Sequence, residues 1–292
     1  MAGLKEIRTR ITSVKTTRQV TSAMKMVSAS RLKKAQDAIL RIRPYAEKLQ
    51  NILTSLSTSF GDSNDSVYAK PREPQKILIV LISSNRGLCG GFNLNIAKKA
   101  VELVNTKYSL QNQLKEVDFI CIGKQGERQV KARGILVVES YHDLYEHFDK
   151  DHVFQMAEKI MKWFTDGKYD RVEMVYNQFL NAAVQNNVTE QFLPIEIEEE
   201  KGLKEYSDYI FEPTKEYIVT ELIPRSLKIQ FYKAMLDSHA AEHGARMTAM
   251  HQATDNATEL LKDLSLQYNK LRQASITNEI LEIVGGAEAL RG

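Results

Sequence analysis

Hydrophobic residues near the start of the chain recur at steps of three, four or seven, which is the spacing of one helical face. This pattern predicts a first helix of about 55 residues, which would be roughly 80 Å long. The positions that carry the pattern are Leu4, Ile7, Ile11, Val14, Val20, Met24, Val27, Leu32, Ala35, Ile39, Ile42, Tyr45, Leu49, Leu53 and Leu56.

The end of the chain, from about Tyr209 to Leu290, carries a second pattern of this kind. After Pro213 and Pro224 it contains no further proline, and no pair of glycines until Gly285 and Gly286. We therefore expect a second long helix, and two such helices at opposite ends of one chain favour an antiparallel coiled coil. Its apolar or small positions are Met247, Met250, Ala253, Ala257, Leu260, Leu264, Leu271 and Ala274.

The lengths of the two helices predict how they face each other. If the first ends near Ser57 and the second begins near Tyr209, facing residue numbers add up to about 266. Residues 22–30 then lie opposite the small residues of 236–244, and the residues after about 266 have no partner. Several large apolar side chains exposed together form an association site, so we expect a protein socket around this end. Its apolar residues are Ile280, Leu281, Ile283, Val284, Ala287, Ala289 and Leu290.

The middle of the chain has the alternating pattern of an α/β domain. Strands are predicted at 76–84, 117–122, 135–140, 171–180 and 188–197, with a hairpin turn around Asn186 and Asn187. Helices are predicted at 94–107, 124–133 and 150–165. The fold class is therefore α/β, with an antiparallel coiled coil of long terminal helices and a small central, Rossmann-like domain with a largely parallel sheet. The expected divisions are the first helix at 1–57, a linker at 58–75, the α/β domain at 76–197, a connector at 198–208 and the last helix at 209–292.

Charge is uneven along the chain. Residues 1–48 hold twelve Lys or Arg and three acids, whereas residues 209–266 hold eight acids and six bases. The second helix therefore cannot neutralise the first, which leaves two interpretations: an acidic partner outside the chain, or a solvated basic face. Nucleic acid is disfavoured as that partner, because the basic residues are spread around the helix with few aromatics among them.

The sequence also indicates the kind of cellular compartment in which the chain is expected. Met-Ala-Gly leads directly into a charged helix, so no signal peptide is expected, and the longest apolar run is too short to span a bilayer. Cys89 and Cys121 are expected to be reduced thiols.

Two motifs could carry chemistry. His239, Glu242 and His243 match an H-x-x-E-H zinc pattern, but no third ligand is evident, so ordinary surface and seam positions on the helix are favoured. Gly87 to Gly91 forms a glycine-rich turn between a strand and a helix, a context that suits phosphate. It matches neither dinucleotide nor P-loop spacing, so a tight turn is favoured. A nucleotide-binding enzyme whose helices form an oligomerisation stalk remains the alternative function.

Four segments together resemble the gamma subunit of F-type ATP synthase. They are IRTRITSVKTTRQVTSAMKMVSASRLKKAQ (7–36), SSNRGLCGGFN (83–93), ARMTAMHQATDNATELLKDL (245–264) and YNKLRQASITNEILEIVGGAEAL (268–290). The resemblance implies a central-stalk rotor that turns inside the alpha–beta hexamer and couples proton flow through the membrane ring to ATP synthesis or hydrolysis. Catalysis would belong to the beta subunits, so the chain itself would be neither an enzyme nor a holder of cofactor or metal.

The resemblance also implies roles for particular residues. Met24 and Lys25 would meet the acidic lever of the beta subunit. Arg272 and Gln273, with Thr277 and Glu279 nearby, would meet a beta catch loop. An apolar sleeve of the hexamer would surround Gly285, Gly286, Ala287 and Leu290, and a foot around Tyr209 and Phe211 would contact epsilon and the c ring. The chain would lie on the cytoplasmic face of a bacterial inner membrane without entering the bilayer or binding nucleic acid.

Overall fold

The computed structural model describes residues 2–60, 67–69, 72–146, 148–195 and 215–289. The chain divides into two compact units, which are described separately: unit 1 is Met1–Ser28 with Met247–Gly292, and unit 2 is Ala29–Arg246. The two terminal helices are α1 (Ala2–Phe60) and α7 (Lys215–Ala289), which contain Pro44 and Pro224. Tyr209, Phe211, Leu290 and the expected connector lie outside the described residues, and the expected domain divisions stay predictions.

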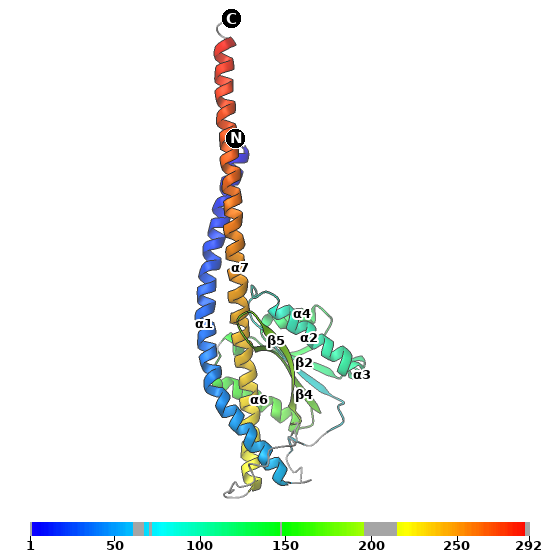
Figure 1. Cartoon of the computed structure of the whole chain (residues 1–292). Coiled ribbons are helices and arrows are strands. Elements are labelled where there is room, and N and C mark those ends of the chain that lie inside the picture. The colour runs from blue at the N-terminus through cyan, green and yellow to red at the C-terminus, as the bar shows by residue number, and fades with distance from the viewer. Residues whose placement is uncertain (1, 61–66, 70–71, 147, 196–214, 290–292) are drawn as a thin grey trace. The chain divides into compact units, whose positions relative to one another are not determined.

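Figure 1 shows the sheet of unit 2, in which β2, β4 and β5 are labelled. The sheet has five strands in the order β3-β2-β1-β4-β5. β1 pairs in parallel with both β2 and β4, β2 pairs in parallel with β3, and β5 is the single antiparallel strand. The predicted fold class, with a largely parallel sheet between long terminal helices, is thereby confirmed. The strands are β1 (Ile77–Ile82), β2 (Val117–Ile122), β3 (Val137–Tyr141), β4 (Arg171–Phe179) and β5 (Gln185–Leu193).

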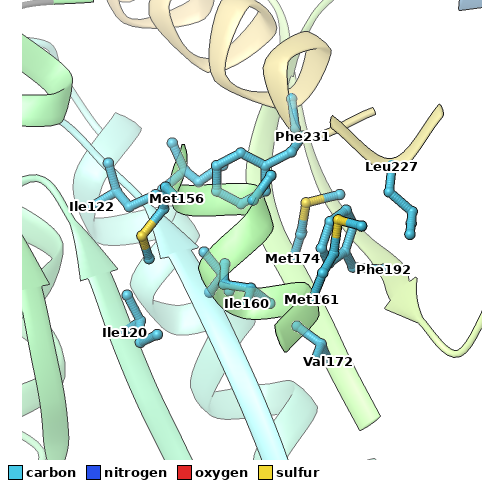
Figure 2. Packing of buried hydrophobic residues seen from close by; sticks show 14 of the residues in the cluster. Ile120, Ile122, Met156, Ile160, Met161, Val172, Met174, Phe192, Leu227 and Phe231 are labelled. Carbon is cyan, nitrogen blue, oxygen red and sulfur yellow. The ribbon is translucent and has the colours of Figure 1, made fainter. Parts of the chain in front are cut away.

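Helices cover both faces of the sheet. The helices of the central domain are α2 (Phe92–Lys107), α3 (Ser109–Gln113), α4 (Lys124–Lys131), α5 (Asp143–Glu146) and α6 (Lys150–Thr165). On one face, Ile96 and Ala100 of α2 and Val130 of α4 pack on β1 and β2. On the other face, α6 and residues 223–235 of α7 pack on the sheet. Phe231 of α7 lies 5.7 Å from Phe192 of β5 between ring centroids, within the core cluster of Figure 2. A long stretch of α7 is therefore part of the core of unit 2.

The predicted position of the hairpin turn is wrong. Asn186 and Asn187 lie inside β5 and pair with Gln178 and Asn177 of β4, so the turn falls at residues 180–184. The side chain of Asn187 donates a hydrogen bond to the amide oxygen of Asn177 across the ladder. This cross-strand contact lets two consecutive asparagines remain in a strand.

Candidate functional site: the paired terminal helices

The seam of unit 1 follows a heptad pattern on α1. Between Leu4 and Ser28, every residue that is buried or half-buried falls on this pattern, apart from Ser22 and Met24, which lie beside it. The seam positions are Leu4, Ile7, Ile11, Val14, Arg18, Thr21, Lys25 and Ser28. The first half of the seam is thus apolar and the second half polar, which is an unusual composition for a coiled-coil core.

The matching positions on α7 repeat with the same period. They are Met250, Thr254, Ala257, Leu261, Leu264 and Tyr268. The hydroxyl of Thr254 donates a hydrogen bond to that of Thr21 across the seam, with 2.8 Å between the oxygens. An antiparallel register through this pair also places Val14 opposite Leu261 and Ile11 opposite Leu264.

The predicted register is wrong by nine residues. Facing numbers that add up to 266 would have placed residue 245, rather than Thr254, opposite Thr21. The point at which α7 extends past α1 moves by a similar amount. Because α1 begins at Ala2, the observed register pairs α7 with α1 up to about residue 273, whereas the predicted register ended this pairing at about residue 266. The expected juxtaposition of 22–30 with the small residues of 236–244 is also wrong, since the same register places 22–30 opposite 245–253.

Beyond Ser275, the described part of α7 is exposed on every side. Residues 276–287 are all exposed, and they include five large apolar side chains with exposed fractions between 48% and 71%. These are Ile276, Ile280, Leu281, Ile283 and Val284. Gly285, Gly286 and Ala287 belong to the same exposed stretch. We call residues 276–287 the free end of α7.

The residues expected to contact beta fall into two separate groups. Met24 and Lys25 are half-buried at the seam, level with Met250. Arg272 lies 22 residues further along α7, about 33 Å away on an α-helix. Arg272, Gln273, Thr277 and Glu279 are exposed. The hydroxyl of Thr277 donates to the carbonyl of Gln273 at 3.0 Å, and Ser275 donates to Glu279 at 3.4 Å. At about 3.6 residues per turn, Arg272 and Glu279 share one face of the helix, and Gln273 and Thr277 share another.

In the part of α1 that belongs to unit 1, three apolar residues were assigned wrongly or missed. Val20 and Val27 were expected in the buried stripe, but they are 51% and 56% exposed, and Met26 is 67% exposed. The heptad that begins at Leu4 continues through Arg18, Thr21 and Lys25, which leaves Val20 and Val27 on another face. Strict heptad spacing, applied in place of apolar character, would have found this. The result is an exposed apolar surface beside Met24.

The glycine-rich turn of unit 2 is in contact with α7. A doubly wound sheet binds ligands beyond the carboxyl ends of its strands, where the order reverses, here between β1 and β4. At this place, one guanidinium nitrogen of Arg246 donates to the carbonyls of Arg86 and Gly87, at 3.2 Å each. Gly90, with φ +59°, allows the turn to close against α7.

Side-chain packing closes the same crevice. Cys89 and Phe92 form a buried cluster with Ala241 of α7. Burial raises the pKa of the Cys89 thiol, so this group is not an activated nucleophile. The residues of the turn therefore bind α7, and the position that nucleotides take in related folds is filled by protein.

The two histidines of the H-x-x-E-H pattern belong to an aromatic column. Their ring centroids lie 4.5 Å apart, and His239 stacks on Phe148 at 5.5 Å. His243 is 3% exposed, and neither ring nitrogen has a hydrogen-bond partner among the described residues. Burial, assisted by His239, Arg246 and Arg31, lowers the pKa of His243 to about 3. The carboxylate of Glu242 pairs with Arg246.

Within the described ranges, no three His, Cys, Asp or Glu side chains are grouped as a metal ion would require. None of the helices in the part of the chain that the structure describes is long and apolar enough to cross a bilayer.

Comparison with known proteins gives consistent results over the full length. A family model described as ATP synthase matches residues 3–290. The chain is 54% identical to the ATP synthase gamma chain of Cytophaga hutchinsonii, with 99% of each chain covered. It is 53% identical to that of Flavobacterium psychrophilum, with both chains fully covered. Among solved structures, a chain of the Euglena gracilis mitochondrial ATP synthase assembly of OSCP, F1 and c-ring has a similar fold. The TM-score is 0.68 at 21% identity, over 99% of this chain and 95% of that one.

Proposed function

The chain belongs to the ATP synthase gamma chain family, and we propose that it is the central-stalk rotor that turns inside the alpha–beta hexamer. In this role it couples proton flow through the membrane ring to ATP synthesis, or hydrolysis, at the beta subunits. The observation that carries the proposal is the free end of α7, where the helix continues past its α1 partner with large apolar side chains exposed. An isolated apolar helix end requires a protein environment.

A non-catalytic role agrees with the interior of unit 2. The crevice at the carboxyl ends of β1 and β4 is filled by Arg246, Ala241 and the glycine-rich turn. These side chains support a domain that holds α7, whereas an enzyme would keep this crevice open for substrate. The chemistry then belongs to the beta subunits.

Met24 and Lys25 are the proposed contact with the acidic lever of beta. Both are accessible at the edge of the seam, and Val20 and Val27 provide exposed apolar surface beside them. The surrounding helix carries the uncancelled excess of Lys and Arg. An acidic partner with apolar contacts would complement both features.

The upper contacts are proposed on α7. Arg272, Gln273, Thr277 and Glu279 form an exposed polar group that would bind the catch loop of beta. The apolar sleeve of the hexamer would then enclose Gly285, Gly286, Ala287 and Leu290. Burying one large apolar side chain contributes roughly 1.5–3 kcal/mol, so the five exposed apolar residues of the free end would add substantially to holding the rotor in place.

The opposite end of the rotor is proposed to rest near the membrane. Tyr209 and Phe211 would form part of the foot that contacts epsilon and the c ring. The gamma chains of Cytophaga hutchinsonii and Flavobacterium psychrophilum come from bacteria. This supports a peripheral position on the cytoplasmic face of the inner membrane.

The proposal is tested by copurification followed by charge reversal. A tagged full-length chain, expressed with its partner subunits, should bring down an alpha–beta hexamer. Lys25→Glu should then impair ATP-driven proton pumping by inverted vesicles, whereas Lys15→Glu, the same change at an exposed position of α1, should impair it far less. Thermal unfolding of both variants controls for the half-buried position of Lys25. A chain that recovers no hexamer contradicts the rotor proposal, and equal pumping by the two variants contradicts the contact at Lys25.

A further inference from the structure

One arginine of α7 is bound on several sides inside unit 2. Arg246 is 8% exposed, and its Nη2 atom lies 3.2 Å from the carbonyl oxygens of both Arg86 and Gly87. Its Nη1 atom pairs with the carboxylate of Glu242, one helical turn earlier and 5% exposed. Arg246 is also the last residue of α7 that belongs to unit 2.

Close packing surrounds α7 immediately before this residue. A Cβ atom added to Gly244 would lie 3.2 Å from the Cα atom of Ala182 and 3.4 Å from the ring of Phe179. On the side of the glycine-rich turn, Cys89 and Phe92 contact Ala241. Residues 86–92 and 179–182 thus contact residues 241–246 of α7, and we call these two segments the collar.

The chemistry of the collar requires arginine at position 246. A buried cation is tolerated when its hydrogen bonds are satisfied, and the guanidinium fork presents several donors in fixed directions. Here one guanidinium joins two backbone carbonyls of the turn to a carboxylate of its own helix. Lysine presents a single compact ammonium group, which cannot reproduce that geometry.

We propose that Arg246 is a positioning residue that locks the turn Arg86–Gly91 to α7, so that torque carried by α7 enters the α/β domain at the collar. The inference rests on the proposed rotor function. In this arrangement, twisting of α7 acts on a rigid, hydrogen-bonded contact at the last helical turn of α7 that belongs to unit 2. Without the contacts of Arg246, the same twist displaces the glycine-rich turn before it moves the rest of the α/β domain.

Angular fluctuations in the assembled complex test this inference. The hexamer is immobilised, and a bead is attached to the α/β domain through Leu110→Cys, which is exposed on α3, whereas both native cysteines are buried. The variance of the bead angle during pauses reports the torsional stiffness between the hexamer and the domain. Arg246→Leu should increase this variance about twofold or more, since the turn loses its polar contacts to α7. Arg246→Lys should give a smaller increase.

The control is a second arginine of the same helix. The guanidinium of Arg225 lies 5.7 Å from the ring centroid of Tyr45, on α1, so Arg225→Leu should leave the variance at the wild-type value. Hydrogen exchange in the complex should show faster exchange for the amides of residues 86–91 in Arg246→Leu alone.

The outcomes separate the two proposals. A wild-type complex that does not rotate overturns the rotor function. A rotating Arg246→Leu complex with wild-type variance overturns the role of Arg246 and leaves the rotor function standing. If Arg246→Leu fails to assemble, Arg246→Lys decides: an increased variance supports the lock, and a wild-type variance overturns it.

Discussion

At the scale of single residues, Asp237 carries a buried carboxyl group that changes its ionisation close to neutral pH. It is 2% exposed on α7, and burial raises its pKa to about 6, although Lys233 and Arg43 act in the opposite direction. The folded chain therefore holds this proton more tightly than the unfolded chain, where the pKa is about 3.9. The free energy of unfolding should fall as the pH rises from about 4 to about 6, and the cost stays present above that range.

Replacing Asp237 by asparagine should remove this cost. Relative to wild type, Asp237→Asn should gain about 1–3 kcal/mol in free energy of unfolding at pH 8 compared with pH 4. Urea unfolding of the chain at both pH values measures the difference. Asp255→Asn, an exposed change on the same helix, should show almost none. Equal pH dependence in the two variants would mean that Asp237 ionises freely in the folded chain.

His243 should have the opposite dependence on pH. Its pKa is lowered to about 3 in the folded chain, whereas an unfolded histidine has a pKa of about 6.5. Stability is thus lost as the pH falls below about 6.5, because the unfolded chain takes up the proton first. His243→Phe should gain about 2 kcal/mol over wild type between pH 7 and pH 5.

Acid-induced unfolding followed by circular dichroism measures this gain. The matched control is His251→Phe, whose ring on the same helix is more than half exposed. Should both variants lose stability in parallel with wild type, the buried ring of His243 would not be the group responsible.

These residue-scale properties could not be predicted from the sequence. The spacing of His239 and His243 places them on one helical face, which the zinc pattern also uses. Their environment comes from Phe148, about a hundred residues earlier, and from Arg31 of the other terminal helix. Burial of a polar group depends on such distant packing, and no local pattern encodes it.

At the scale of elements, the parts of the chain with strong local signals were predictable. β1 is a continuous apolar run that is buried on both faces, β2 is apolar apart from Asp118, and α6 carries a clear apolar stripe. The hairpin turn was wrong because Asn186 and Asn187 are typical turn residues, whereas cross-strand pairing holds them in β5. The register of the terminal helices was wrong because it was counted from helix ends, where sequence signals are weakest.

Crosslinking distinguishes the two registers of the seam. Thr21→Cys with Thr254→Cys should form a disulfide on mild oxidation, because the native hydroxyls lie 2.8 Å apart. Thr12→Cys with Thr254→Cys, the pair that the register of 266 would bring together, should not. The native cysteines are buried, so a gel-shift assay reports the engineered pair. Preferential crosslinking of the second pair would restore the predicted register.

For the molecule as a whole, the described structure assigns different tasks to the two halves of α7. From Ile223 to Arg246 the helix is largely buried in the core of unit 2, and it packs there with large apolar residues and a few polar ones. From Ser265 onward it is mostly exposed, yet it retains isoleucine and leucine. A sequence can therefore carry a buried segment and an interaction segment in one uninterrupted helix, and hydrophobicity alone does not separate them.

The free end of α7 provides the last prediction, since its apolar residues stabilise nothing within the described chain. Changing Ile280, Ile283 and Val284 together to glutamine should alter the free energy of unfolding of the isolated chain by no more than about 0.5 kcal/mol per site. The assembled complex should instead dissociate at least about tenfold faster, because each lost apolar contact is worth roughly 1.5–3 kcal/mol. Leu260→Gln with Leu266→Gln, exposed leucines outside the free end, serve as the control. Dissociation is followed by dilution and native electrophoresis, and an unchanged lifetime of the triple variant would show that the hexamer does not hold the rotor by this end.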